Sequence, residues 1–392
     1  MSVFDQLQPF VSLCQACGLI PYTTKHNSVT GKFERFTFSI GNFSTWWFLL
    51  VLVLQISIVV LIGQLNEELQ GAVLSTDRNI PTTMIVLTGV SSTAFLAQLV
   101  SSRWIVLKYR RLGNAVEAVQ KAESLFGEKF IAEHQSSIKT RFLAGFAVIV
   151  IMTISGMFLF EPLHAALLPK DLNVFLTTAL FAVLASVNVM FDCSLLFVYI
   201  CYYIIAHYIQ LISLRFKEED NDDFHATVRK GTEKINVMRR NALIFDYLCR
   251  ASSEINSVFS FPLLFLLGIK FVTIVTSGFI SIYRFIHTNT LLLETGFWVN
   301  PFVCCTEIIR IWIYLAIVEM PVNQVRLLHE RVTAMSLSGF PKIFCEKVMA
   351  LLVQLDEDRV HLSAAGLFKV GMHLVPALTG AGVTYMVILL QN

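Results

Sequence analysis

Residues that bind metals or act in catalysis are sparse and unfavourably spaced in this chain. None of the nine histidines lies three or four residues from another, and the closest pair is His361 and His373, so no helix face carries two histidine ligands. Cys14 and Cys17 have the spacing of a metal or redox pair, but without a second pair ordinary packing is the favoured interpretation. No glycine-rich phosphate loop and no Gly-x-Ser-x-Gly motif occurs. We therefore expect no enzyme, no metal site and no cofactor.

Four charged side chains are candidates for function because they interrupt otherwise apolar stretches: Asp192, Lys270, Glu307 and Arg310. A charge inside a bilayer is costly and needs a partner. Glu307 and Arg310 are three residues apart and share one face of a helix, so we expect them to pair with each other or with Lys270 in a structural polar network. A role in coupling a ligand pocket to a pore is the alternative.

The elements that position these charges are predicted to be membrane helices. Of the 392 residues, 55% are hydrophobic and only 15% are charged, and the mean hydropathy is +0.65, which is more apolar surface than one soluble core would bury. Seven nearly uncharged runs are each long enough for the ~20 residues of a helical span. They cover residues 44–66, 79–102, 142–160, 172–214, 255–283, 295–318 and 370–392. The predicted fold class is therefore all-α, with seven transmembrane helices.

Helices are also expected outside the membrane. The fourth run contains no glycine or proline on which to turn, so we expect one long helix whose tyrosine-rich end passes the interface and continues into water. The tyrosines in question are Tyr199, Tyr202, Tyr203 and Tyr208. Apolar residues at helical spacing predict two amphipathic cytoplasmic helices. One carries Leu112, Val116, Val119, Leu125 and Phe130, and the other Phe344, Val348, Leu351, Leu352 and Leu355.

The distribution of lysine and arginine predicts the orientation in the membrane. Of the 30 basic residues, 25 lie before the first span or in the segments 103–141, 215–250 and 326–369, which alternate along the chain with poorly charged connections. Cytoplasmic connections are rich in lysine and arginine, so the N-terminus is predicted to be cytoplasmic and the C-terminus extracellular. This orientation is opposite to that of G-protein-coupled receptors and argues against that class. Residues 1–42 show no secretory signal.

The last span has one face of small and polar residues. At ~100° per residue, Thr384, Ile388 and Gln391 share a stripe with three small residues, Ala377, Gly380 and Ala381, while Met386, Leu389 and Leu390 point the other way. A glutamine amide in hydrocarbon needs a partner, so this stripe is expected to meet either another helix or water. Helix packing and a pore lining are equally consistent with these residues.

The C-terminal residues resemble those of the insect gustatory and odorant receptor superfamily. The last span of that family carries Thr-Tyr, five mostly aliphatic residues, then Gln and usually Phe, and Thr384, Tyr385 and Gln391 match this pattern, with Asn392 in place of Phe. Residues 363–368 resemble the small-residue segment that opens the same span. Residues 18–39 resemble the Pro-aromatic lead before the family's first span.

The resemblance implies a chemosensory receptor that is a ligand-gated, nonselective cation channel in the plasma membrane, most like a gustatory receptor. Such a channel is a homotetramer that binds a small-molecule tastant, passes cations and contacts membrane lipid but no nucleic acid. Four copies of Gln391 would form a polar ring, and four of Ile388 an apolar constriction that closes by dewetting, on a pore face that includes Thr384. Four regions follow: a cytoplasmic N-terminal segment (1–43), a six-helix ligand-binding region with long cytoplasmic connections (44–318), a cytoplasmic helical anchor (319–369) and the pore-lining helix (370–392).

The ligand pocket of that family lies among the spans, toward the outer side. At the outer ends of the predicted spans the candidates are Phe158, Glu161, His164, Tyr283, Trp298 and Asn300. Aromatic residues at these depths also form interfacial belts, which is the alternative for each. A secondary transporter is the alternative function, because it would also use the four intramembrane charges, although no internal repeat of spans supports it.

Overall fold

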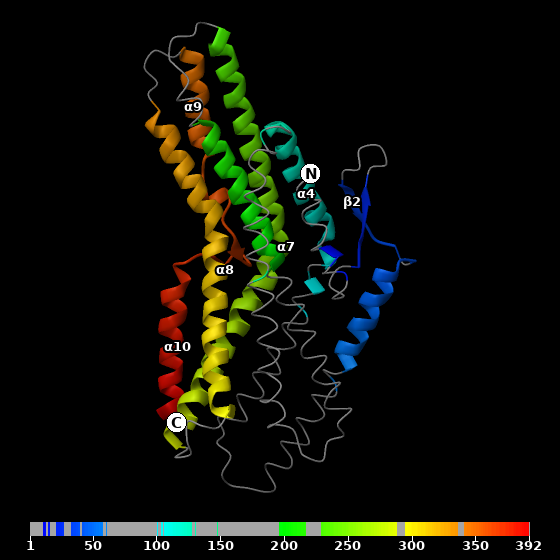
Figure 1. Ribbon diagram of the computed structural model, residues 1–392, viewed down its shortest axis with the longest axis vertical. Helices are drawn as coiled ribbons and strands as arrows, with labels where there is room; N and C mark the ends of the chain where they lie inside the picture. The colour runs from blue at the N-terminus through cyan, green and yellow to red at the C-terminus, as the bar shows by residue number, and fades with distance from the viewer. Residues whose placement is uncertain are drawn as a thin grey trace.

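Helices dominate the part of the chain that the computed structural model describes, which is residues 21–26, 33–39, 41–57, 106–127, 196–216, 229–287, 295–335 and 341–391 with a few isolated positions. The helices are α4 (Tyr109–Phe126), α7 (Arg229–His287), α8 (Thr295–Ala334), α9 (Lys342–Gln354) and α10 (Leu374–Gln391), with two more over Phe43–Ser57 and Leu196–Phe216. Two antiparallel hairpins, β1 (Thr23–His26) with β2 (Phe33–Thr37) and β3 (Ser363–Ala364) with β4 (Phe368–Lys369), and a 3-10 turn η1 (Glu357–Arg359) complete the set. Figure 1 shows α7 and α8 running along most of the molecule.

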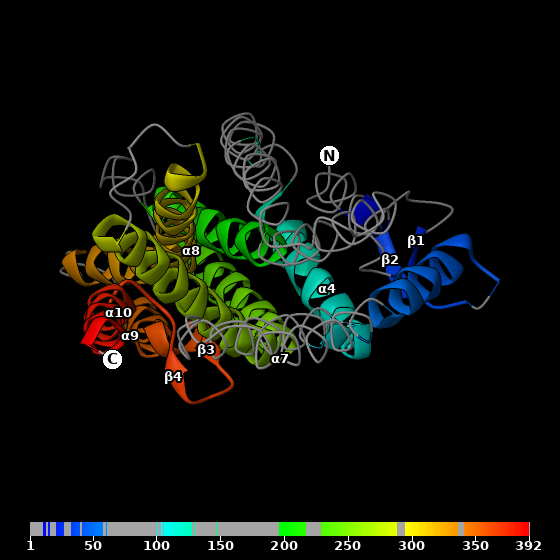
Figure 2. The ribbon, with the colours of Figure 1, turned by 90° about the horizontal axis from the view of Figure 1, so that it is seen from below.

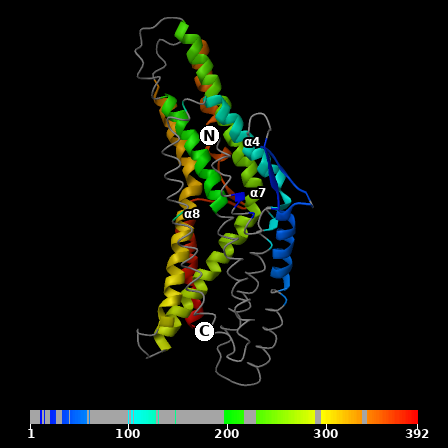
Figure 3. The ribbon, with the colours of Figure 1, turned by 45° about the vertical axis from the view of Figure 1, so that its right-hand side comes forward.

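α7 and α8 are far longer than a membrane span requires. They contain 59 and 40 residues, which at ~1.5 Å per residue corresponds to roughly 90 and 60 Å, whereas the hydrocarbon core of a bilayer is about 30 Å thick. The nearly uncharged runs 255–283 and 295–318 are therefore one part of each helix. Both helices run from the end of the molecule that carries α9 to the end at which α10 terminates (Figure 3).

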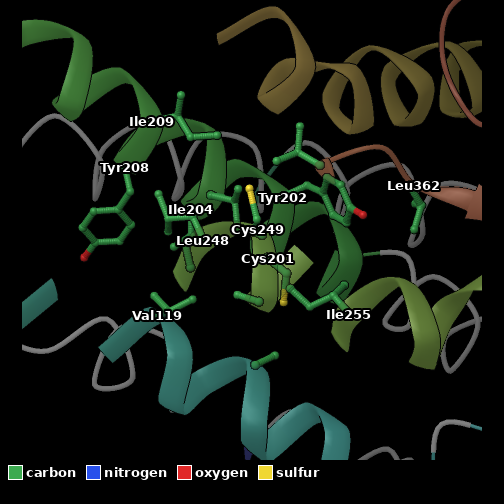
Figure 4. Close-up of a cluster of buried hydrophobic side chains, with 14 of the residues drawn as sticks. Val119, Cys201, Tyr202, Ile204, Tyr208, Ile209, Leu248, Cys249, Ile255 and Leu362 are labelled. Carbon is green, nitrogen blue, oxygen red and sulfur yellow. The ribbon is translucent and has the colours of Figure 1, made fainter. Parts of the chain in front are cut away.

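The main hydrophobic core lies where the helix Leu196–Phe216 packs against α4 and α7, as Figure 4 shows. Tyr202 is fully buried and Tyr208 is 2% exposed. The Tyr208 ring stacks on Phe126 of α4 with centroids 5.5 Å apart. The prediction that this tyrosine-rich end is exposed to water is therefore wrong for these two side chains, whereas the position of the helix end beyond the membrane interface stays a prediction. The physical reason is that α4 and the long extension of α7 surround this end of the helix and exclude water from it.

Both predicted amphipathic helices are present. α4 buries Leu112, Val119 and Phe126, together with three alanines that allow close approach to α7. α9 buries Phe344, Val348 and Leu351, whose spacing places them on one face. These apolar stripes are covered within the single chain.

The two β-hairpins correct the all-α prediction. In the first, Thr23 pairs with Thr37, and Tyr22 stacks on Tyr109 of α4 with ring centroids 4.4 Å apart. In the second, Ala365 and Gly366 form the turn with φ of 52° and 75°. Positive φ at two consecutive residues matches the turns that join antiparallel strands, and glycine reaches it without a Cβ clash. Each hairpin is too short to show a pattern in the sequence.

Three helices in the described part of the chain are long and apolar enough to cross a membrane: Leu196–Phe216, Ile235–Ile282 and Leu374–Gln391. A shorter apolar helix, Phe43–Ser57, lies within the first predicted span. The second and third predicted spans, 79–102 and 142–160, lie almost entirely outside the described residues. The count of seven spans therefore stays a prediction.

Candidate functional site

The last helix, α10, lies at the edge of the helical bundle, as the end-on view in Figure 2 shows. It packs mainly on α7, and Gly382 is its only buried residue among those described. Apolar residues predominate along this helix, yet most of its residues are exposed or half-buried within the single chain. A helix this apolar and this uncovered requires lipid, further protein or both around it.

The predicted small and polar stripe lies on the uncovered side of α10. Ala377, Gly380, Thr384, Ile388 and Gln391 are all exposed, and Ile388 keeps 46% of its surface. Of the residues that the sequence placed on the other side, Met386 and Leu389 are half-buried, but Leu390 is exposed, and Ala381 of the predicted stripe is half-buried. Thr384, Ile388 and Gln391 therefore lie on the uncovered side, but the uncovered side is wider than the predicted stripe and includes Leu390.

The covered side of α10 makes specific contacts with α7. Tyr385 meets Phe271 edge to face, with ring centroids 6.1 Å apart. A Cβ added at Gly382 would lie 3.8 Å from Phe271 and 3.9 Å from Val275, which is ordinary van der Waals contact. Small residues at a helix interface let the backbones approach closely, and Gly382 serves that purpose here.

Thr384 illustrates how a polar residue is accommodated on the uncovered side. Its Oγ1 donates to the carbonyl oxygen of Gly380 at 2.9 Å, one turn earlier in the same helix. The hydroxyl proton is therefore satisfied within α10 in any surroundings. Gln391 has no such bond among the described residues, and its amide is exposed. Of the two, only the glutamine therefore needs a partner outside its own helix.

Three of the four predicted intramembrane charges form one buried cluster. Glu307 Oε2 lies 2.7 Å from Nζ of Lys270, and Glu307 Oε1 accepts a hydrogen bond from Arg310 at 3.1 Å. The three side chains are 7%, 8% and 16% exposed for Glu307, Lys270 and Arg310. Both expected pairings therefore occur together, with one carboxylate shared by two cations from two helices. Asp192 lies outside the described residues.

The start of α10 is held by polar contacts that the sequence did not predict. Glu319 Oε2 of α8 accepts a hydrogen bond from the backbone N–H of Met372 at 2.5 Å. Free N–H groups at a helix start favour a carboxylate, so Glu319 stabilises this end of α10 from another helix. The hairpin before it docks on α7, because Asn256 Oδ1 accepts from the N–H and Oγ of Ser363 at 3.1 and 3.2 Å.

Ion pairs involve the segment that joins α9 to α10. Arg326 donates two hydrogen bonds to Glu357, at 3.1 and 3.0 Å, and these bonds lower the pKa of the Glu357 carboxyl. Lys369 bonds to Asp358 at 2.5 Å and lowers its pKa in the same way. Burial, followed by the nearby Lys369 charge, lowers the pKa of His361. The junction between α9 and α10 is thus a charged, structured segment.

The predicted ligand pocket falls largely outside the described residues and side chains. Phe158, Glu161 and His164 lie outside the described residues. Tyr283 lies near the end of α7, and Trp298 and Asn300 lie in the first two turns of α8, where the backbone is described but the side chains are not. The C-terminal end of α7 and the N-terminal end of α8 lie at the same end of the molecule as the C-terminal end of α10 (Figure 1). These pocket residues therefore stay predictions.

Comparisons with known proteins identify the family. The family model described as 7tm Chemosensory receptor matches residues 7–391, which is nearly the whole chain. The chain is also 27% identical over 155 residues to Putative gustatory receptor 28a of Drosophila melanogaster, a match that covers 38% of this chain and 34% of that protein. The shared segment thus spans about a third of the curated relative's length.

Solved structures support the same assignment at the level of the fold. The insect olfactory receptor OR5 from Machilis hrabei superposes with a TM-score of 0.67 at 13% identity, covering 99% of this chain and 98% of the receptor. Its complex with eugenol superposes with a TM-score of 0.69 at 11% identity and the same coverage. The resemblance noted in the C-terminal residues is confirmed by the family match along the chain. This protein belongs to the 7tm chemosensory receptor family.

Proposed function

We propose that the chain is a gustatory receptor of the plasma membrane that acts as a ligand-gated, nonselective cation channel, built as a homotetramer with α10 of each subunit lining the pore. The observation that carries this proposal is the side of α10 that the subunit leaves uncovered. This side holds Thr384, Ile388 and Gln391, and it faces away from α7.

A central pore satisfies the residues on that side better than lipid does. An amide that faces hydrocarbon lacks the hydrogen bonds it has in water, which is costly, whereas an amide in a pore keeps them. Ile388 lies one turn from Gln391, so a symmetric assembly stacks an apolar ring beside a polar ring. An apolar constriction that excludes water closes a pore without a mechanical plug.

A small organic tastant fits this receptor class as the ligand. The structurally similar receptor OR5 has been solved in complex with eugenol. Phe158, Glu161, His164, Tyr283, Trp298 and Asn300 remain the proposed pocket residues, because apolar walls with a few polar groups suit a small ligand. A transporter is less well supported, because Glu307 is already bonded to both Lys270 and Arg310.

Substitutions on the two sides of α10 test the pore. Ile388→Ala should raise the cation current measured without ligand, because a smaller apolar ring wets more readily. Gln391→Arg should suppress cation current or shift its reversal potential toward that of anions, because four fixed positive charges in a narrow pore repel cations. Currents are recorded from cells with matched surface expression.

Leu389→Ala is the matched control for these two variants. Leu389 is half-buried on the side of α10 opposite the uncovered stripe, so its truncation should alter packing but not ion selectivity. Normal cation conduction in Gln391→Arg, together with altered selectivity in Leu389→Ala, would show that the stripe packs on a neighbouring helix instead of lining a pore.

A further inference from the structure

Three helices meet at Gly278, a residue of α7 within its apolar part. A Cβ placed on Gly278 would lie 2.8 Å from Sδ of Met386 in α10 and 3.7 Å from Sγ of Cys304 in α8. The first distance is shorter than real Cβ contacts, so any larger side chain would displace Met386. The missing Cβ therefore sets how closely α10 lies against α7.

The residues of α7 near Gly278 contact two neighbouring helices, α8 and α10. Lys270 and the carbonyl of Ile274 face α8, through the ion pair with Glu307 and a 3.7 Å contact from Cys304 Sγ. Phe271 and Val275 face α10. At ~100° per residue, Gly278 lies about 80° around the helix from Lys270 and about 20° from Phe271. It therefore sits at the boundary of the two faces.

Near Gly278, the contact of α7 with α8 is held more firmly than its contact with α10. The bond from Lys270 to Glu307 is a buried ion pair, and Glu307 also holds Arg310. An ion pair excluded from water resists separation more strongly than the van der Waals contacts that join α7 to α10. α7 and α8 therefore act as one support, and α10 is the element that can move against it.

Met386 lies on the side of α10 opposite the proposed gate. It precedes Ile388 by two residues, which is about 200° around the helix. Displacement of Met386 away from α7 therefore moves Ile388 and Gln391 in the direction they already face. In a pore lined by that side, this direction is toward the axis, so direct contact of Met386 with α7 favours a wider pore.

We propose that Gly278 is a positioning residue for the gate: its missing Cβ lets Met386 lie directly against α7, which holds the gate side of α10 back from the pore axis. This inference rests on the proposed channel function. A side chain at Gly278 pushes Met386 and α10 toward the axis and holds the pore closed, whereas a shorter side chain at Met386 lets α10 lie closer to α7 and eases opening.

Basal cation current in the Ile388→Ala background tests this without a ligand. Adding Gly278→Ala should lower that current, and adding Met386→Ala as well should restore it, with an interaction of about threefold or more between the two substitutions. Gly268→Ala is the matched control, because it is the same change in the same helix, and a Cβ there would meet nothing within 4 Å. Surface expression is matched in every variant.

The outcomes separate a gating role from a structural one. A lower melting temperature in Gly278→Ala with unchanged current per surface channel overturns the proposal, as do strictly additive effects of the two substitutions. If Gly278→Ala does not reach the surface, Met386→Ala alone decides, since it should raise the basal current, and an unchanged current overturns the proposal. If Ile388→Ala itself carries no current, the channel function fails first, and that result is recognisable before the Gly278 variants are compared.

Discussion

At the scale of single residues, the buried carboxylate of Glu307 is held by two cations from two helices. It is shared by Lys270 and Arg310, and all three side chains are largely excluded from solvent. Removing two cations from water is costly, and the shared carboxylate offsets that cost only while it stays in contact with both. The cluster therefore specifies how α7 and α8 align.

We predict that Glu307→Gln destabilises the protein by about 3–5 kcal/mol, because it leaves two buried cations without their counter-charge. The expected result is poor surface expression and a clearly lower melting temperature in detergent. Glu357→Gln is the control, since its ion pair with Arg326 is exposed and screened by water and salt. Equal melting temperatures for the two variants would mean that the cluster is hydrated and contributes little.

At the scale of elements, the hairpin β3–β4 determines where α10 begins. Ser363 is bonded twice to Asn256, and the N–H of Ala365 donates to the carbonyl oxygen of Ser260 at 2.8 Å. Together with the bond from Met372 to Glu319, these contacts fix one end of α10 to α7 and α8. The rest of the helix is held mainly by packing on α7.

Asn256→Ala is expected to loosen this attachment, because it removes the acceptor for both donors of Ser363. A loss of about 1–2 kcal/mol is expected, with faster hydrogen exchange in β3 and in the first turns of α10. Ser260→Ala is the control, because Ser260 contributes only its backbone carbonyl. Comparable exchange rates in the two variants would indicate that the hairpin is held by other contacts.

At the scale of the whole molecule, the position of the basic residues agrees with the orientation predicted from the sequence. The basic residues of α9, of the first part of α7 and of the last part of α8 lie in the half of the molecule opposite the end of α10 (Figure 1). A membrane placed across the apolar parts of α7, α8 and α10 would leave these charges on one side. This arrangement supports the proposed cytoplasmic N-terminus and extracellular C-terminus.

Epitope tags test this orientation. A tag before Met1 should be invisible to antibody on intact cells, and a tag after Asn392 should be labelled, because 25 of the 30 basic residues lie in the segments predicted to be cytoplasmic. Permeabilised cells are the control and should label both tags. Labelling of the N-terminal tag alone on intact cells would reverse the topology and remove the basis for the proposed pore.

The assembly is tested by mass. Because the stripe on α10 is uncovered in the single chain and α9 exposes Ile343, Met349 and Val353, detergent-purified protein should run as a homotetramer in native mass measurement. A monomer that conducts cations after reconstitution would contradict the proposed assembly.

Several features follow from the sequence because they depend on local periodicity. The stripes of α4 and α9, the two sides of α10 and the pairing of Glu307 with Arg310 all reflect residues three or four positions apart, which one turn of helix brings together. The apolar runs that mark α7 and α10 as membrane helices are equally local. The C-terminal resemblance also rests on contiguous residues, and the family match confirms it.

Other features were decided only by the tertiary structure, because they depend on segments far apart in the chain. Tyr208 looked like a residue of a water-exposed helix until α4 and α7 enclosed it. Gly278 is an ordinary glycine in the sequence, and only the approach of Met386 shows why a side chain is excluded there. Glu319 likewise has no local signal for its bond to Met372. The sequence therefore determined which helices form and which side of each is apolar, whereas packing decided which residues meet, because contacts between distant segments have no periodicity to reveal them.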